Sequence, residues 1–246
     1  MDNWSSFLPL STELNCRLIA IDLPGHGFSE HIQDGNWYHF IDYIVRLKEI
    51  VAKLHLKKFH IIGHSMGAGI GSLYTGTFPE QILSLIMIDG LGPLVNPAND
   101  ARDILRDSIL KQGNKKLRKR SFENITLAIK TRMSAGDLSF KSAKILVENQ
   151  MRKNESGWNW TYDYKLKDTS SLRLTPEQLE SVFIKIKCPV LIIAASNGYI
   201  LKSPYWNKRL LIENLIEREL NGGHHLHMDE PKETANLINN FYENQR

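Results

Sequence analysis

Short apolar runs alternate with segments of helical periodicity through most of the chain. Over residues 38–54 apolar residues recur at helical spacing, which predicts an amphipathic helix. Further helices are expected over residues 4–15, directly after residue 65, and over residues 231–242. Compact apolar runs typical of buried strands lie at residues 17–22, 59–63, 82–88, 188–195 and 215–220. Strands that alternate with helices predict a mostly parallel sheet with helices on both faces.

The strand pattern stops between residues 91 and 187. Three or four helical segments rich in Lys and Arg take its place, and such a stretch is too long for a loop in a compact domain. We therefore expect an α/β core formed by residues 1–90 and 188–246. The intervening residues 91–187 are expected to form a helical cap over the carboxyl ends of the strands, where open α/β sheets bind ligands.

Composition narrows the functional classes. The chain has 246 residues, 42% of them hydrophobic and 24% charged, which is ordinary for one globular domain with an insertion. The net charge of +4 is too small to indicate a nucleic-acid partner, and its basic residues concentrate at 111–120, where a solvated cap helix is the simplest interpretation. No apolar run reaches the roughly 18 residues of a membrane span. Cys16 and Cys188 are isolated, which predicts reduced core thiols and a cytoplasmic protein.

Residues 63–67, Gly-His-Ser-Met-Gly, follow a predicted strand and precede a helical pattern. This G-x-S-x-G motif in a strand–turn–helix context predicts that Ser65 has a strained backbone and an exposed Oγ. The glycines on either side, Gly63 and Gly67, are expected because side chains there would not fit. The helix N-terminus favours developing negative charge, and the Met66 N–H is the expected oxyanion donor. An ordinary glycine-rich turn is the alternative.

Three motifs together resemble the α/β-hydrolase superfamily, in the branch with a serine nucleophile and a cap. They are Asp-Leu-Pro-Gly-His-Gly at 22–27, the motif around Ser65, and Gly-Gly-His ending at His224. Residues 1–4, 195–199 and 224–228 are similar to the serine hydrolase-like group in particular. The resemblance implies an α/β-hydrolase fold and a triad in the chain order serine, acid, histidine. His224 matches the catalytic histidine of the family.

The acid is harder to assign from sequence. Its commonest place in the family is just after the strand that ends at Ala195, but no carboxylate follows there before Glu213. Asn197 could orient an imidazole, yet it cannot stabilise imidazolium by charge. Asp89, at the end of the run 82–88, is therefore our choice, with a turn aspartate before Gly90 as the alternative.

The resemblance also implies a difference from the family at the N-terminus. Family members have a His-Gly-Trp loop, preceded by a central strand and two further strands, before the segment that matches residues 1–4. That central strand would lie between the runs at 17–22 and 59–63. We therefore expect N-terminal strands to be missing, which leaves two strand edges unpaired and removes one of two oxyanion donors.

Aromatic and histidine residues supply the remaining candidates. Trp158 and Trp160, which alternate with tyrosines, either line an apolar acyl pocket or anchor the cap. His227 is expected at the pocket mouth or in the loop structure, and the same applies to His225. The histidines at 224–227 together with Asp229 have the residue types of a metal site, but no second cluster supports one. No cofactor motif is present, so we expect neither a metal nor a cofactor.

These features predict a serine hydrolase of a small ester-type substrate that works through an acyl-enzyme. Ser65 is the nucleophile, His224 the base and Asp89 the acid, with a small molecule as the partner and no nucleic acid. The alternative from another class is a catalytically impaired, truncated hydrolase-fold protein that binds a ligand or partner.

Overall fold

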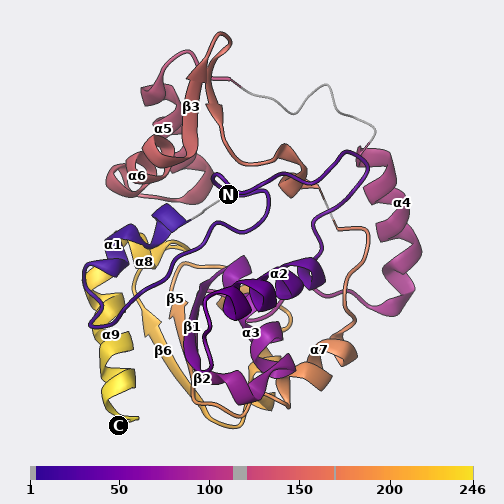
Figure 1. Cartoon of the computed structure of the whole chain (residues 1–246), viewed down its shortest axis with the longest axis vertical. Helices are drawn as coiled ribbons and strands as arrows, with labels where there is room; N and C mark the ends of the chain where they lie inside the picture. The colour runs from indigo at the N-terminus through magenta and orange to yellow at the C-terminus, as the bar shows by residue number, and fades with distance from the viewer. Residues whose placement is uncertain (1–3, 113–120, 169, 246) are drawn as a thin grey trace.

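The core is a four-stranded parallel sheet between two layers of helices (Figure 1). The computed structural model describes residues 4–112, 121–168 and 170–245. The strand order is β1-β2-β5-β6, and the strands are β1 (Phe59–His64), β2 (Ile82–Ile88), β5 (Val190–Ala195) and β6 (Leu215–Leu220). The predicted runs at 82–88 and 215–220 therefore form strands with the expected bounds, and the predicted parallel sheet with helices on both faces is confirmed.

Alternate residues of the central strands enter two separate hydrophobic clusters. On β2, Leu85 and Met87 face one cluster, which includes residues of three core helices: α2 (Phe40–Lys53), α3 (Met66–Thr77) and α7 (Pro176–Phe183). Ile86 and Ile88 face the other cluster, which contains residues of α1 (Leu8–Ser11), α8 (Leu226–Asp229) and α9 (Pro231–Glu243). Because both faces are covered, the strand is apolar except for the buried Ser84 and shows no polar alternation.

Short 3₁₀ helices complete the core and its connections. They cover Trp4–Phe7, Pro79–Gln81, Ala98–Asp100, Tyr164–Lys167, Ile200–Lys202 and Trp206–Leu211. The helix expected over 4–15 is thus a 3₁₀ turn followed by α1, which ends at Ser11. Cys188 is buried as predicted, but Cys16 is exposed, so the expectation that it lies in the core is wrong. No helix in the described part of the chain is long and apolar enough to cross a membrane.

The strand predicted at residues 17–22 does not form. Instead, residues 17–21 and β1 both line one cavity of about 1260 Å³, and within the described residues β1 pairs with β2 alone. A six-residue strand covered on both faces occupies roughly 20 × 4.8 × 10 Å, or about 950 Å³. The cavity can therefore hold one strand, and none of the strands in the described part of the chain pairs with residues 17–22.

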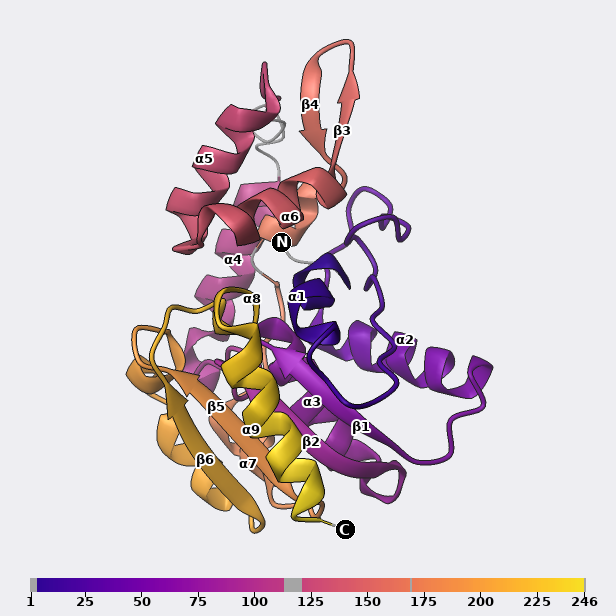
Figure 2. The same cartoon turned by 90° about the vertical axis from the view of Figure 1, so that its left-hand side faces the viewer.

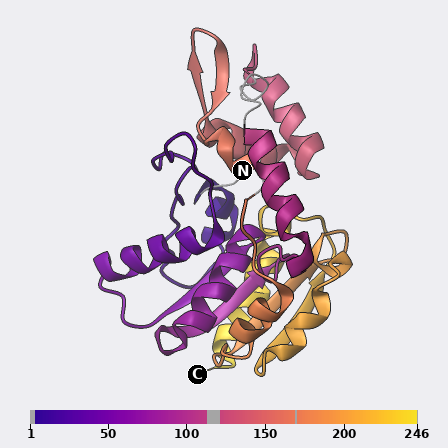
Figure 3. The same cartoon turned by 90° about the vertical axis from the view of Figure 1, so that its right-hand side faces the viewer.

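Within the described part of residues 91–187, the predicted helical cap, the structure has helices and, in addition, a hairpin that was not predicted (Figures 2 and 3). The cap contains α4 (Ala101–Gln112), α5 (Ile125–Gly136) and α6 (Phe140–Gln150), followed by an antiparallel hairpin of β3 (Met151–Asn154) and β4 (Gly157–Trp160). Its hydrophobic cluster is separate from those of the core. By contrast, α7 packs on α3 in the core. Most of the basic segment, residues 113–120, lies outside the described residues.

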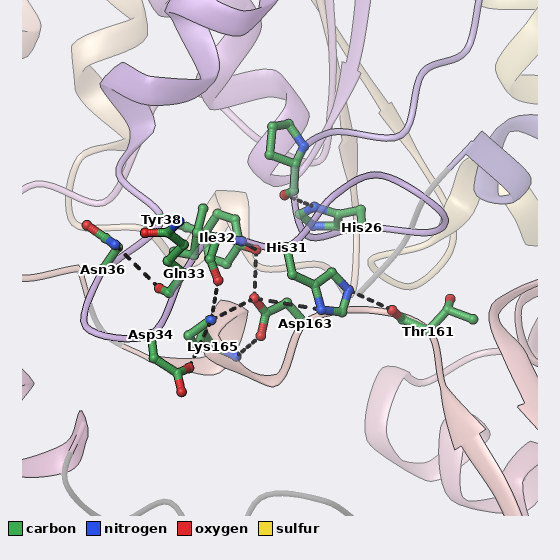
Figure 4. Close-up of polar contacts among 11 residues, drawn as sticks. His26, His31, Ile32, Gln33, Asp34, Asn36, Tyr38, Thr161, Asp163 and Lys165 are labelled. Carbon is green, nitrogen blue, oxygen red and sulfur yellow. Dashed lines mark hydrogen bonds and ion pairs between the residues drawn. The ribbon is translucent and has the colours of Figure 1, made fainter. Parts of the chain in front are cut away.

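A buried polar cluster joins the loop after residue 24 to the end of the cap (Figure 4). The Asp163 carboxylate is 1% exposed, accepts a 2.8 Å hydrogen bond from the Tyr38 hydroxyl, and lies 3.4 Å from the Lys165 ammonium. That ammonium also donates to the Ile32 carbonyl, and the Asp163 N–H donates to the Gly25 carbonyl over 2.7 Å. Because the charges are paired and hydrogen-bonded, their burial is compensated and this junction is held in one geometry.

Candidate active site

Ser65 lies at a sharp turn between β1 and α3. Its φ of 53° and ψ of −115° are a strained conformation for a residue with a side chain, as the motif predicts. Its N–H donates to the Ile88 carbonyl over 3.0 Å, so the turn is held against β2. The side chain stands at the N-terminus of a 12-residue helix, which favours an anionic group there.

Close backbone contacts explain two glycines around this turn. A Cβ on Gly63 would lie 2.3 Å from the Gly67 carbonyl oxygen, and one on Gly90 would lie 2.7 Å from the Ser65 carbonyl oxygen. The expectation for Gly63 is therefore confirmed, and Gly90 is a requirement that the sequence analysis missed. A Cβ on Gly67 would meet nothing within 4 Å, so the steric explanation for that glycine is wrong.

His224 lies between Ser65 and Asp89. Its Nε2 is 2.9 Å from the Ser65 Oγ, and its Nδ1 is 2.6 Å from the Asp89 Oδ2. When Nδ1 carries the proton and donates it to the carboxylate, Nε2 presents a lone pair to the serine hydroxyl. The structure thus brings together the three residues that the sequence analysis selected. Such an arrangement can remove the serine proton and stabilise the resulting imidazolium.

The Asp89 carboxylate is buried and accepts three hydrogen bonds. Besides His224, the backbone N–H groups of Ala195 and Tyr199 donate to it over 3.2 and 3.1 Å. Burial raises the pKa of Asp89, but the hydrogen bonds from His224, Tyr199 and Ala195 together lower it by more. The net pKa of Asp89 therefore lies below its ordinary value. Asp89 is therefore expected to remain an anion at neutral pH.

The loop after β5 holds this carboxylate with its backbone. A Cβ on Gly198 would lie 2.3 Å from the Asp89 Oδ1, so any larger residue would displace the carboxylate. Asn197 is exposed, and its N–H donates to the Gly222 carbonyl in the loop that carries His224. Gly198 was not among the residues predicted from the sequence. The signal that could have revealed it is a glycine at the family's usual acid position, next to the absent carboxylate.

Two other histidines and one tyrosine lie near the Ser65, His224 and Asp89 side chains. His64 Nε2 donates to the His224 carbonyl over 2.7 Å, which fixes the backbone of His224. The rings of His64 and His227 are 4.1 Å apart, and His227 is fully buried. The ring centroid of Tyr199 lies 4.5 Å from that of His224. The His224 imidazole is therefore in contact with neighbouring aromatic rings, which restrict its rotation.

The cavity beside β1 reaches the reactive groups. Its lining includes Ser65, Met66 and His224 at one end and apolar side chains of α2, α3 and β1 along its length. Neither Trp158 nor Trp160 lines it, since both pack against the cluster of the cap, and His227 lies behind His64. The role of these three residues in substrate binding stays a prediction that this cavity does not support.

Comparisons with known proteins identify the family of the chain. A family model described as alpha/beta hydrolase fold matches residues 1–231. A "Serine hydrolase-like protein" of Danio rerio is 29% identical over 93% of this chain and 74% of its own length. A "Probable serine hydrolase" of Drosophila melanogaster is 30% identical over 98% of this chain and 77% of its own length. The crystal structure of a hypothetical protein from Pseudomonas aeruginosa PAO1 has a TM-score of 0.92 and 30% identity, covering 98% of this chain and 88% of that one. The chain belongs to the α/β-hydrolase fold family.

Proposed function

We propose that the protein is a serine hydrolase that cleaves a small carboxylic ester through an acyl-enzyme. Membership of the α/β-hydrolase family supports a hydrolase, and the ester substrate and triad are the finer part of the proposal. The observation that carries it is the chain of contacts from Ser65 Oγ through His224 to Asp89, at 2.9 and 2.6 Å. A serine with a strained backbone that hydrogen-bonds to a histidine, which in turn hydrogen-bonds to a buried carboxylate, is explained better by catalysis than by a structural role.

The reaction follows from the position of each group. The Ser65 Oγ attacks the ester carbon while His224 Nε2 takes its proton, and the Met66 N–H donates to the carbonyl oxygen as it becomes an oxyanion. Imidazolium then protonates the departing alcohol, which leaves an acyl group on Ser65. Water, deprotonated by His224, attacks this acyl carbon and releases the acid, and the proton returns to Ser65.

The cavity also supports a second candidate, a protein that binds ligands but hydrolyses slowly. The space next to Ser65 and Met66 is open along β1, so one side of the expected oxyanion position faces a large cavity. An oxyanion site with one donor in place of two reacts about 10²–10³ times more slowly. Covalent labelling separates the two candidates, since it requires an activated serine.

A fluorophosphonate probe and a series of p-nitrophenyl esters test the proposal. We expect Ser65 to be labelled, the Ser65→Ala variant to remain unlabelled, and acetate or butyrate esters to turn over. Equal labelling of both proteins would contradict the assignment of the nucleophile. Stoichiometric labelling without turnover of any ester would favour the second candidate. Cell fractionation would test the cytoplasmic location, which remains part of the proposal.

A further inference from the structure

A second cluster of histidines lies directly behind the triad. His64 is the last residue of β1, and His225 and His227 come from the turn that starts α8. All three are buried, and one ligand atom from each lies within 4.8 Å of the other two. The ring centroid of His64 is 4.1 Å from that of His227 and 5.0 Å from that of His225. Three imidazoles from two distant parts of the chain thus converge on one point.

The spacing suits a small divalent ion after modest rotation of the rings. Zinc binds imidazole nitrogen at about 2.0–2.1 Å, so two nitrogens of a tetrahedral site are roughly 3.3 Å apart. The nitrogens here need to approach by about 1.5 Å at most, which side-chain rotation can supply without a change of backbone. Three histidines with one open position form a ligand set that zinc sites use, and imidazole suits zinc, cobalt, nickel and copper.

Neighbouring carboxylates do not belong to this cluster. Asp229, which the sequence places in the same loop, accepts hydrogen bonds from the hydroxyls of Ser139 and Ser142 at 2.5 and 2.6 Å. Asp89 is hydrogen-bonded to His224. The set of residues that could hold a metal therefore differs from the sequence-based one, because His64 replaces Asp229 and His224. An all-imidazole set disfavours magnesium and calcium, which bind oxygen ligands.

The structure shows a route by which an ion can reach the histidine cluster and a positive charge that lies beside it. His64 and His225 line the cavity beside β1, which gives an ion and a water molecule a route to the cluster. The Arg132 guanidinium opposes binding, because its Nη2 lies 3.4 Å from the Nε2 of His225. Ligation by His225 therefore uses Nδ1 or displaces Arg132, and removing this positive charge should strengthen binding.

We propose that His64, His225 and His227 form a binding site for one zinc-type transition-metal ion. A consequence rests on the proposed hydrolase function. His64 Nε2 donates to the His224 carbonyl, and His225 follows His224 in sequence, so an ion held by these rings shifts the base relative to Ser65. A misplacement of 1 Å can lower turnover about 100-fold. The ion is therefore an inhibitor of this site and takes no part in the reaction.

Cobalt titration of chelator-treated Ser65→Ala protein tests binding without any use of activity. We expect one equivalent of Co²⁺ to give the visible bands of a tetrahedral site, and Zn²⁺ to displace it. X-ray absorption of the zinc form should show nitrogen ligands at about 2.0–2.1 Å. Binding no tighter than about 1 mM, or an octahedral cobalt spectrum, would overturn the proposal.

Matched variants locate the site. His227→Leu and His225→Leu should each weaken Co²⁺ binding at least about 100-fold, whereas His39→Leu and His224→Asn should leave it unchanged and Arg132→Gln should strengthen it. Circular dichroism melts identify any variant that fails to fold, and the cavity-lining His225 is the safer of the two ligand positions. Loss of binding in His224→Asn with retention in His225→Leu would place the ion on the catalytic base and overturn the proposal. Zinc inhibition of ester turnover is measured separately, so failure of the hydrolase assignment leaves the binding result intact.

Discussion

Replacing Asp89 with asparagine removes the charge of the triad with little change of shape. Two N–H groups, from His224 and Tyr199, donate to Oδ2, and the N–H of Ala195 donates to Oδ1. An asparagine has one acceptor oxygen and one NH₂ group, so in either orientation its NH₂ faces at least one donor. The three hydrogen bonds cannot all survive.

Both orientations of the amide damage the site. With NH₂ at the Oδ2 position, His224 must accept at Nδ1 and carry its proton on Nε2, where it can no longer take the proton of Ser65. The wrong tautomer lowers kcat about 10⁴-fold in the Ser-His-Asp triad of serine proteases, which corresponds to about 5.4 kcal/mol of transition-state stabilisation. With NH₂ at the Oδ1 position, a buried N–H of Ala195 loses its acceptor, at a cost of roughly 1–3 kcal/mol of folding stability.

Steady-state kinetics with a p-nitrophenyl ester check this prediction. We expect Asp89→Asn to lower kcat by about 10³–10⁴ with a small change in KM, and Asn197→Ala to remain close to the wild type, since Asn197 is exposed. Thermal melts show whether the protein is still folded. A folded Asp89→Asn variant with kcat within tenfold of the wild type would refute the assignment of the acid.

Three further changes test other parts of the structure. Gly198→Ala places a Cβ 2.3 Å from the Asp89 carboxylate, so kcat should fall about 10–100-fold in a folded protein, and unchanged kcat would show that the carboxylate does not need this position. Tyr38→Phe removes the hydroxyl that donates to the buried Asp163, and urea unfolding should show a loss of about 1–3 kcal/mol; a loss below 0.5 kcal/mol would mean that the cluster tolerates the change. A strand of about six Val and Ile residues, added to the N-terminus on a short linker, can pair with β1. It should raise the free energy of unfolding by roughly 2–5 kcal/mol over that of a Gly/Ser extension of equal length. Equal thermal melts of the two proteins would show that the cavity does not accept a strand.

Apolar runs that have a neighbouring strand were the most predictable part of the fold. The runs that became β2 and β6 have the expected bounds because neighbouring strands supply their hydrogen bonds. The run at 17–22 has equally strong strand character but forms no strand, since pairing depends on a neighbour and not on the run itself. The hairpin of the cap was missed because its two short strands were hidden among helical segments.

In the candidate site, too, residues in local sequence motifs could be predicted, whereas contacts between residues remote in sequence could not. Ser65 and Asp89 were selected from their places after predicted strands, and His224 from its match to the catalytic histidine of the family. Parallel strands bring the ends that carry them together. Glycine is required at position 90 because a side chain there would meet the Ser65 backbone, and at position 198 because one would meet the Asp89 carboxylate. Both contacts join residues that are remote in sequence. The meeting of His64 with His225 and His227 likewise depends on β1 lying beside the last loop, which no local pattern reveals.

Mass spectrometry of the acyl-enzyme tests the central claim most directly. The protein is mixed with a p-nitrophenyl ester, quenched with acid within one turnover, digested and mapped for an acyl adduct. We predict one acyl group on the peptide that contains Ser65, its accumulation before a slower steady state, and its absence in Ser65→Ala. An adduct on another residue, or full turnover in Ser65→Ala, would contradict the account.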